Sequence, residues 1–250
     1  ESQGDNVAGG AYCYTINGNM IAGFGLIAWP VKYAETGVHT FLVDGRRVSR
    51  DLLDSALELA FLDRHLGISR PPVRTILDIG AGYGRLAYRA VTAFPESVRY
   101  LCTDAIATST FLCEYYLGFR GVGGHESSPA RVLPLDELES AIAPGTVDVA
   151  VNIHSFSECP PVAIDAWIAF LARKRVGHLM VVPNAVTYDG SAGADGSDGV
   201  TMRTNEGLDF TRIVHRHGYR LVASEPKFPD PVVQEYGLSP AAHLLFRLQS

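Results

Sequence analysis

The sequence predicts an α/β fold: a doubly wound, mostly parallel sheet of seven strands with helices on both faces and a cap at its N-terminus. From Val73 onward, short apolar runs alternate with longer amphipathic runs, which is typical of a parallel sheet covered by helices. Glycine and proline separate these runs, and a glycine-rich turn follows the first of them. The chain has 250 residues, which is enough for one Rossmann-like domain and an additional segment.

The positions of the apolar runs give the elements of the main domain. Expected strands are Val73–Ile79, Val98–Thr103, Ala130–Leu133, Val147–Ile153, Leu179–Val182, Tyr219–Ser224 and His243–Leu248. Expected helices are Arg85–Phe94, Ala107–Leu117, Asp136–Ala143, Pro161–Ala172 and Leu208–Arg216.

The first 70 residues are expected to form a cap. Residues 1–48 contain glycine and aromatic residues with little clear period, which indicates short strands or turns. A helix is expected over Arg50–Leu66, because apolar residues recur there at helical spacing. A Pro-Pro pair then separates this cap, residues 1–70, from the main domain, residues 71–250.

Composition indicates a globular protein and argues against two classes of partner. The net charge is −6, and Lys and Arg are scattered along the chain, so no nucleic acid is expected as a partner. Residues 6–31 carry no charge, but five glycines and a proline interrupt them and no basic region precedes them, so neither a membrane span nor a signal peptide is expected. The four cysteines are widely spaced without a CxxC pair, which makes a reducing cytoplasm the expected compartment.

The stretch Thr75–Arg85 reads as an apolar strand, an acid, and glycines at three alternate positions. A dinucleotide fingerprint would require a third glycine where this chain has Arg85. A pyrophosphate disfavours a neighbouring carboxylate, whereas the ammonium and sulfonium groups of S-adenosylmethionine (SAM) favour Asp78. Spacing and charge therefore predict a SAM site, and the structural alternative is a tight turn capped by Asp78. The residues expected to contact the cofactor here are Asp78, Gly80, Ala81, Gly82 and Tyr83.

Further cofactor contacts are expected where later strands end, because ligands of open α/β sheets bind at the carboxyl ends of the strands. Asp104 follows the second strand and can accept hydrogen bonds from both ribose hydroxyls, with Ala105 beside it. Leu135 follows the third strand, where adenine would lie. The alternatives are a surface acid or helix cap at Asp104 and the start of a helix after Leu135.

A polar cluster follows the fourth strand, in the run Asn-Ile-His-Ser-Phe-Ser-Glu. It places Asn152, His154 and Glu158 beside the expected methyl group. His154 is the first candidate for a general base that removes a hydroxyl proton, and Glu158 is the second, or it orients His154 or the substrate. The alternative is a structural histidine and a helix cap. A metal site that adds Asp230 is conceivable but not indicated, so the metal requirement is unknown.

Two long connections remain. The first, residues 184–207, is rich in Gly and Asp and is expected to be either a mobile loop or a substrate lid. The second, Glu225–Pro240, has four prolines and is expected to be a rigid loop between strands. Its polar residues suit a ligand with many hydroxyl groups, and a structural connection is the alternative. The residues expected to bind substrate are Lys227, Asp230 and Tyr236, with Gln234 nearby.

The residues from Asp78 to Arg85 resemble motif I of class I SAM-dependent methyltransferases. Three other stretches, Ser109–Phe119, Asn152–Glu158 and Glu225–Pro240, are similar to a bacterial family of sugar O-methyltransferases, and the likeness covers about residues 45–250. The resemblance implies methylation of a hydroxyl on a sugar or a glycosylated metabolite in natural-product or polysaccharide biosynthesis. The cofactor would be SAM and the product S-adenosylhomocysteine (SAH).

The sequence therefore predicts a SAM-dependent O-methyltransferase of a small, sugar-containing acceptor. N-methylation of a small metabolite or peptide is the nearest alternative. A SAM-binding regulatory or partner module without activity is a second alternative, and an NAD-dependent dehydrogenase is a third. The sequence does not name the acceptor and leaves the oligomeric state open, with a homodimer as one option.

Overall fold

The computed structural model describes the backbone of residues 6–9, 12–19, 23–30, 41–43, 50–192, 198–228, 230–236 and 241–249. It describes the side chains of these residues from 51 onward, except those of 189–192, 198, 233 and 236. The chain forms two compact units. One comprises residues 1–56 and 226–240, and the other comprises residues 57–225 and 241–250.

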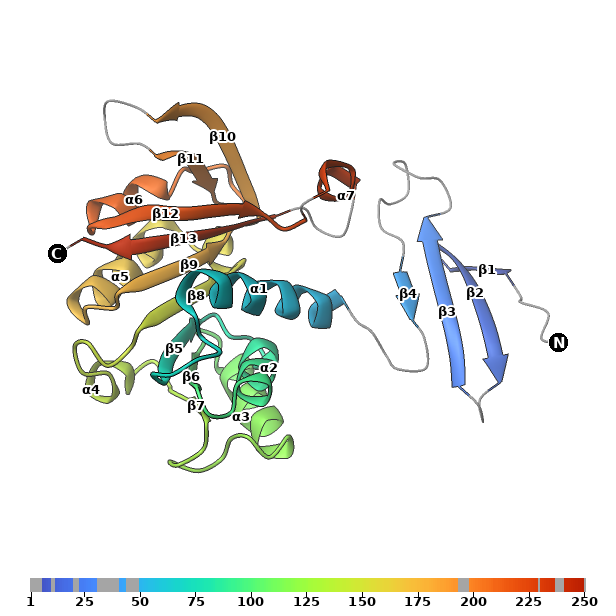
Figure 1. Cartoon of the computed structure of the whole chain (residues 1–250), viewed down its shortest axis with the longest axis horizontal. Helices are drawn as coiled ribbons and strands as arrows, with labels where there is room; N and C mark the ends of the chain where they lie inside the picture. The colour runs from blue at the N-terminus through green and yellow to red at the C-terminus, as the bar shows by residue number, and fades with distance from the viewer. Residues whose placement is uncertain are drawn as a thin grey trace. The chain divides into compact units, whose positions relative to one another are not determined.

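The larger unit is built on a seven-stranded sheet, which confirms the predicted fold class (Figure 1). Its strands are β5 (Arg74–Ile79), β6 (Val98–Thr103), β7 (Ala130–Val132), β8 (Val149–Ile153), β9 (His178–Val182), β12 (Tyr219–Pro226) and β13 (Ala242–Leu248). They lie in the order β12-β13-β9-β8-β5-β6-β7. The five from β9 to β7 pair in parallel, and β13 pairs antiparallel with β9. The carboxyl ends of β5 to β9 therefore share one edge of the sheet.

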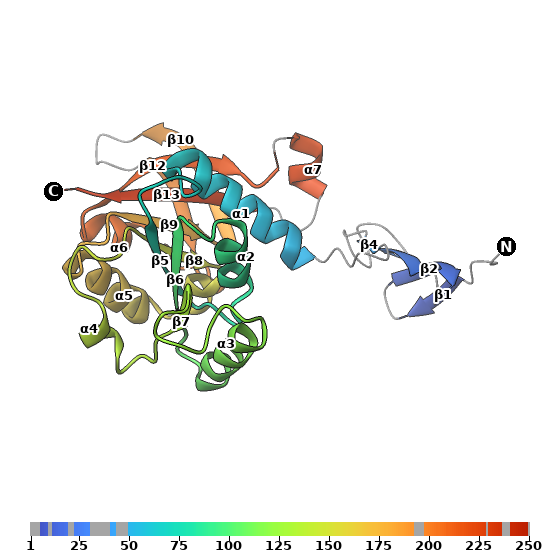
Figure 2. The same cartoon turned by 60° about the horizontal axis from the view of Figure 1, so that its bottom comes forward.

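Helices cover both faces of this sheet (Figure 2). The helices are α1 (Arg50–Leu66), α2 (Arg85–Ala93), α3 (Ala107–Phe119), α4 (Leu138–Ala141), α5 (Pro161–Arg173) and α6 (Thr211–Arg216). One buried cluster joins the sheet to α1, α2 and α3, and the other joins it to α4, α5 and α6. Strand β5 contributes to both: Ile76 packs in the first cluster, and Leu77 and Ile79 pack in the second. This alternation follows from the two-residue side-chain period of a strand.

Element boundaries agree with the prediction to within two or three residues. The last helix, α6, begins at Thr211 rather than Leu208. The backbone N–H of Phe210 instead bonds the carbonyl of Met202, and the Asp209 carboxylate accepts from the N–H of Thr211. The extended segment before α6 is therefore held by the preceding strand, and Asp209 closes a tight turn just before the helix N-cap, Phe210.

The stretch predicted to be an irregular loop, residues 184–207, contains a β-hairpin, so the loop prediction was wrong, and the alternative role as a substrate lid stays a prediction. Strands β10 (Ala185–Ala192) and β11 (Asp198–Arg203) pair antiparallel, and residues 193–197 lie outside the described residues. Val200 and Met202 are buried with Phe210 in the cluster on the α5 side of the sheet. Burial of these apolar residues overrides the loop-like Gly and Asp composition of the stretch.

The smaller unit contains a four-stranded antiparallel sheet in the order β1-β2-β3-β4. Its strands are β1 (Asn6–Gly9), β2 (Tyr12–Asn19), β3 (Gly23–Pro30) and β4 (Phe41–Val43), in agreement with the short strands expected there. The unit also includes the short helix α7 (Pro231–Tyr236) within the predicted proline-rich loop. That loop is therefore partly helical. No described helix is both long enough and apolar enough to cross a bilayer.

Candidate functional site

The glycine loop follows β5 at the carboxyl edge of the sheet. Gly80, Gly82 and Gly84 have φ angles of 79°, 57° and 84°, which are left-handed values that favour glycine. The backbone N–H groups of Gly80 and Ala81 donate to the carbonyl of Thr103 at 2.9 and 3.1 Å, so the loop is fixed to the end of β6. A Cβ on Gly80 would lie 2.2 Å from the Ser155 hydroxyl oxygen, whereas a Cβ on Gly82 would meet no atom within 4 Å. Gly80 thus allows close packing, and Gly82 borders open space.

Asp104 stands beside this loop, at the end of β6. One carboxylate oxygen accepts from the N–H of Gly82 at 3.1 Å, and the other accepts from the N–H of Ile106 at 2.8 Å. Each oxygen can accept more than one hydrogen bond, so the partly exposed carboxylate keeps capacity for a ligand. The structure therefore brings Asp104 against the loop, and its role in ribose binding stays a prediction.

Apolar side chains stand exposed close to Asp104 and at the next strand end. Ile106 follows Asp104 and is 63% exposed, and Leu135 follows β7 and is 47% exposed. The strands that carry them, β6 and β7, are neighbours in the sheet. Ala105 is exposed, and Tyr83 contacts Tyr116 edge to face, with ring centroids 5.3 Å apart. Sequence reasoning did not select Ile106, although its position two residues after the acid that ends the second strand was a usable signal.

Asp78 lies on β5, with its side chain only 4% exposed. The Tyr100 hydroxyl donates to its Oδ2 at 3.0 Å. Burial raises the pKa of Asp78 to about 7, against the opposing influences of the Tyr100 hydrogen bond and the Arg85 charge. Burial, with the Asp78 charge beside it, also holds the pKa of Tyr100 well above its usual range. The carboxyl group is thus a buried anionic site that is only half-ionised near neutral pH.

A buried ion pair links α1 to the start of α2. The two terminal guanidinium nitrogens of Arg85 donate to the two carboxylate oxygens of Glu58, at 2.8 and 2.9 Å. The side chains are 17% and 3% exposed, respectively. Arg85 is the first residue of α2, so the pair fixes the end of the glycine loop. Sequence reasoning identified neither Glu58 nor Tyr100, because their partners lie more than 20 residues away.

Asn152 is fully buried at the end of β8, and its side-chain amide makes hydrogen bonds within the protein. Its Nδ2 donates to the Ile79 carbonyl at 2.9 Å and to the Ser155 hydroxyl at 2.6 Å, and its Oδ1 accepts from the N–H of Phe156 at 2.9 Å. These bonds join the end of β8 to the end of β5 and to the short 3₁₀ helix η1 (Ser155–Glu158). Any role of Asn152 in the cofactor site would therefore be that of a positioning residue.

His154 lies between β8 and η1 in a strained conformation, with φ 67° and ψ −33°. Its N–H donates to the carbonyl of Val182 at 2.8 Å, and its carbonyl accepts from the N–H of Ser157 at 3.0 Å. Such a conformation costs roughly 1–3 kcal/mol in a non-glycine residue and is found preferentially at functional sites. The strain therefore supports a functional role for this partly buried histidine.

Glu158, the second candidate base, is exposed at the end of η1. Burial raises the pKa of the Cys159 thiol, and the charges of Glu158 and Asp104 raise it further. Both carboxylates therefore act on one region at the carboxyl edge of the sheet.

The three predicted substrate residues belong to the smaller unit. Lys227 is buried and pairs with Asp54 at 2.6 Å. Asp230 accepts from the N–H of Val232 at 2.9 Å and caps α7, and the side chain of Tyr236 lies outside the described residues. Substrate binding by these residues stays a prediction. Within the described part of the chain, no group of three or more His, Cys, Asp or Glu side chains is arranged to hold a metal ion.

Comparisons with known proteins give the fold but not a family for the whole chain. A family model described as "Protein of unknown function (DUF2950)" matches residues 1–60. A search of curated proteins found no significant match.

Three solved structures illustrate the likeness in fold, each with a TM-score of 0.53 and each matching 78% of this chain. The cyclase SpnF is 15% identical over 81% of its own length. A geranyl diphosphate methyltransferase in complex with SAM is 15% identical over 85% of its own length. The geranyl diphosphate C-methyltransferase from Streptomyces coelicolor A3(2) is 13% identical over 79%.

Proposed function

We propose that this protein is a SAM-dependent O-methyltransferase that acts on a hydroxyl group of a small, sugar-containing acceptor. The observation that carries the proposal is the meeting of the glycine loop, Asp78 and Asp104 at the carboxyl edge of the sheet, with His154 at the end of an adjacent strand. The similar structures support the proposal because two of them are methyltransferases and one contains SAM. SpnF has a similar fold but is a cyclase, so the fold alone does not decide the activity.

The residues present fit this cofactor. The open space over Gly82 leaves room for a ligand against the loop backbone. Asp104 would accept hydrogen bonds from the ribose hydroxyls, and the exposed side chains of Ile106 and Leu135 would cover the adenine. Asp78 would supply negative charge for the amino group of the methionine part. The sulfonium of SAM supplies the reactive methyl group.

The chain's own contribution to catalysis would be positioning and proton removal. A hydroxyl group is a weak nucleophile while it keeps its proton, so the acceptor oxygen needs a base as its bond to the methyl carbon forms. His154 would take that proton, and its fixed backbone would hold the imidazole in one place. SAM, held by the glycine loop and Asp104, would supply the methyl group from its sulfonium, and the sulfur would leave as the neutral thioether of SAH.

Two measurements test this function in order. We expect SAM and SAH, but not NAD, to raise the unfolding temperature by about 5 °C or more at 100-fold excess over Kd. Stabilisation by NAD alone would overturn the cofactor assignment. Incubation with SAM and a panel of sugars, sugar nucleotides, glycosylated natural products and amines, followed by mass spectrometry, should then give single methylation on oxygen. Methylation on nitrogen would favour the N-methyltransferase alternative, and tight SAM binding without any product would favour a binding module.

A further inference from the structure

Two exposed asparagines at the base of the hairpin form a site that the sequence did not reveal. The Asn184 Nδ2 donates to the Asn205 Oδ1 at 2.9 Å, across 21 residues of sequence. We propose that this Asn184–Asn205 amide pair is the acceptor subsite, and that it selects an uncharged acceptor rich in hydroxyl groups over a phosphorylated one. The inference rests on the proposed function, since the acceptor must reach His154.

The amide pair is held next to η1. The N–H of Asn184 donates to the Ser157 hydroxyl at 2.9 Å, and the N–H of Asn205 donates to the Ser157 carbonyl at 2.7 Å. Ser157 is buried and bonds through its own N–H to the carbonyl of His154. One residue, Ser157, therefore ties both asparagines to the backbone of His154.

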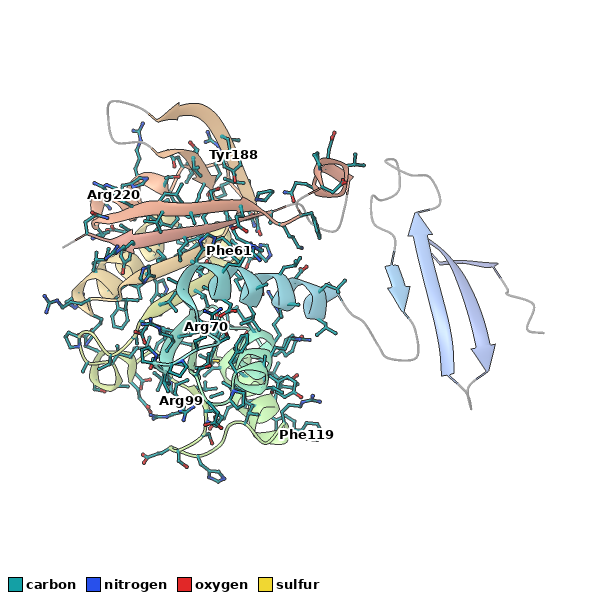
Figure 3. The ribbon with its side chains drawn as sticks, in the orientation of Figure 1. Phe61, Arg70, Arg99, Phe119, Tyr188 and Arg220 are labelled. Carbon is teal, nitrogen blue, oxygen red and sulfur yellow. The ribbon has the colours of Figure 1, made fainter. Side chains whose placement is uncertain are left out.

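The hairpin that carries these residues is anchored at several points. The hydroxyls of Tyr188 on β10 and Ser224 on β12 lie 3.0 Å apart, and Tyr188 is labelled on the hairpin in Figure 3. The turn after β11 is closed by two bonds between Thr204 and Leu208, at 2.9 and 3.1 Å. A rigid support of this kind is what a positioning subsite requires.

The chemistry of the pair suits hydroxyl groups. After their mutual bond, Asn184 keeps a carbonyl oxygen and one N–H, and Asn205 keeps both N–H donors. Both side chains are exposed, so these groups face solvent. A hydroxyl donates and accepts at once, and neighbouring hydroxyls on a ring can use both kinds of partner.

The charge around the pair disfavours a phosphate. The three segments that build this place, residues 152–160, 183–188 and 204–210, contain Glu158, Glu206 and Asp209 but neither Lys nor Arg. Two cations flank these segments: Arg203 donates to the Gly207 carbonyl at 3.0 Å, and the exposed Arg212 lies 3.9 Å from Asp209. An anionic group here would meet carboxylates without a free cationic partner from these segments.

Ligand-observed saturation-transfer NMR on the full chain, with and without SAH, tests the proposal. The neutral probes are methyl β-glucopyranoside and methyl α-rhamnopyranoside, and the anionic probe is glucose 6-phosphate. The variants are Asn184→Ala and Asn205→Ala, which keep the backbone bonds to Ser157. The control is Gln249→Ala, which removes an exposed amide beyond β13 at the opposite edge of the sheet.

We expect at least one neutral probe to bind wild type, and each asparagine variant to weaken it about fivefold to tenfold, as loss of one or two hydrogen bonds implies. The control should bind as wild type does, and glucose 6-phosphate should bind more weakly than the neutral probes. Three outcomes would each overturn the subsite. They are failure of both neutral probes to bind wild type, tighter binding of glucose 6-phosphate than of the neutral probes, and binding of a neutral probe by the asparagine variants with wild-type affinity. The SAH affinity of the same samples separates the two proposals, because failure to bind SAH would overturn the proposed function instead.

Discussion

At the scale of single residues, Asp78 is a carboxyl group whose charge depends on what binds beside it. Its ordinary pKa is 3.8, and burial raises the folded value to about 7. Between these values the folded protein keeps a proton that the unfolded chain has lost, so the free energy of unfolding falls as pH rises from about 4 to about 7. A cationic ligand favours the ionised form, so its binding should release a proton.

We therefore expect the affinity for SAM to rise between pH 6 and pH 8 in wild type. Asp78→Asn should bind SAM weakly, because the amide carries no negative charge, and the affinity should not change with pH, because the amide does not titrate. In wild type the Asp78 carboxyl should lower the free energy of unfolding by on the order of 3 kcal/mol between pH 4 and pH 7, and the variant should not show this decrease. Calorimetry in two buffers of different ionisation enthalpy measures the released proton, and chemical denaturation measures stability. An unchanged pH dependence in Asp78→Asn would contradict this account.

His154 allows a second prediction at the same scale. We expect His154→Ala to lower kcat by roughly a hundred- to ten-thousandfold while SAH binds with near wild-type affinity, because a general base contributes that much to rate. His154→Gly is the matched control, since glycine accepts the φ of 67° without strain. It should be more stable than His154→Ala and equally inactive. Undiminished turnover in either variant would show that another group removes the proton.

At the scale of elements, the glycine loop separates two reasons for glycine. Gly80 lacks room for a Cβ because Ser155 of η1 lies against it, whereas Gly82 borders open space. Both have positive φ. The loop is thus packed against the protein at its first glycine and open at its second, where the ligand is proposed to lie.

We expect Gly80→Ala to destabilise the fold by roughly 2 to 5 kcal/mol, from backbone strain and the clash together. Gly82→Ala should cost only about 1–2 kcal/mol from strain, yet weaken SAH binding tenfold or more. Gly145→Ala is the control, because Gly145 has φ 80°, has open space for a Cβ, and precedes β8 at the opposite edge. Denaturant unfolding and calorimetry distinguish these effects. Equal SAH binding by Gly82→Ala and Gly145→Ala would remove Gly82 from the site.

At the scale of the whole molecule, the buried clusters belong to the larger unit. All their members lie between Leu59 and Phe246, on both faces of the seven-stranded sheet. The proposed SAM residues lie in the same unit. The cofactor site and its supporting core can therefore be expected to form without the first strands of the chain.

A chain that begins at residue 49 should fold cooperatively and bind SAH as the full chain does. Residues 1–48 are the larger part of the predicted cap, residues 1–70. If this part covers the acceptor site, the shortened chain should lose methyl transfer while it keeps SAH binding. Circular dichroism, calorimetry and product mass spectrometry measure the three properties. Loss of SAH binding with an intact fold would show that the first residues belong to the cofactor site. Undiminished transfer would contradict the cap.

The sequence was sufficient to predict strands and candidate site residues where the local residue pattern and the residue chemistry agree. All seven strands of the large sheet were predicted, because each contains an apolar run and most are bounded on at least one side by glycine, proline or an acid. The loop glycines, Asp78 and Asp104 could be selected because strand order in an α/β sheet brings successive strand ends to one edge. The hairpin at residues 185–203 was missed because its Gly and Asp content outweighed a short alternation of Val200 and Met202.

What the sequence determined by itself is the order of strands and helices and the chemical identity of the strand-end residues, since both depend on patterns within a few positions. Only the tertiary structure decided which of these residues meet distant partners. It pairs Asp78 with Tyr100, Arg85 with Glu58, and Asn184 with Asn205. Such contacts are fixed by sheet order and helix packing, and a pKa near 7 at Asp78 comes from burial, which no local pattern encodes.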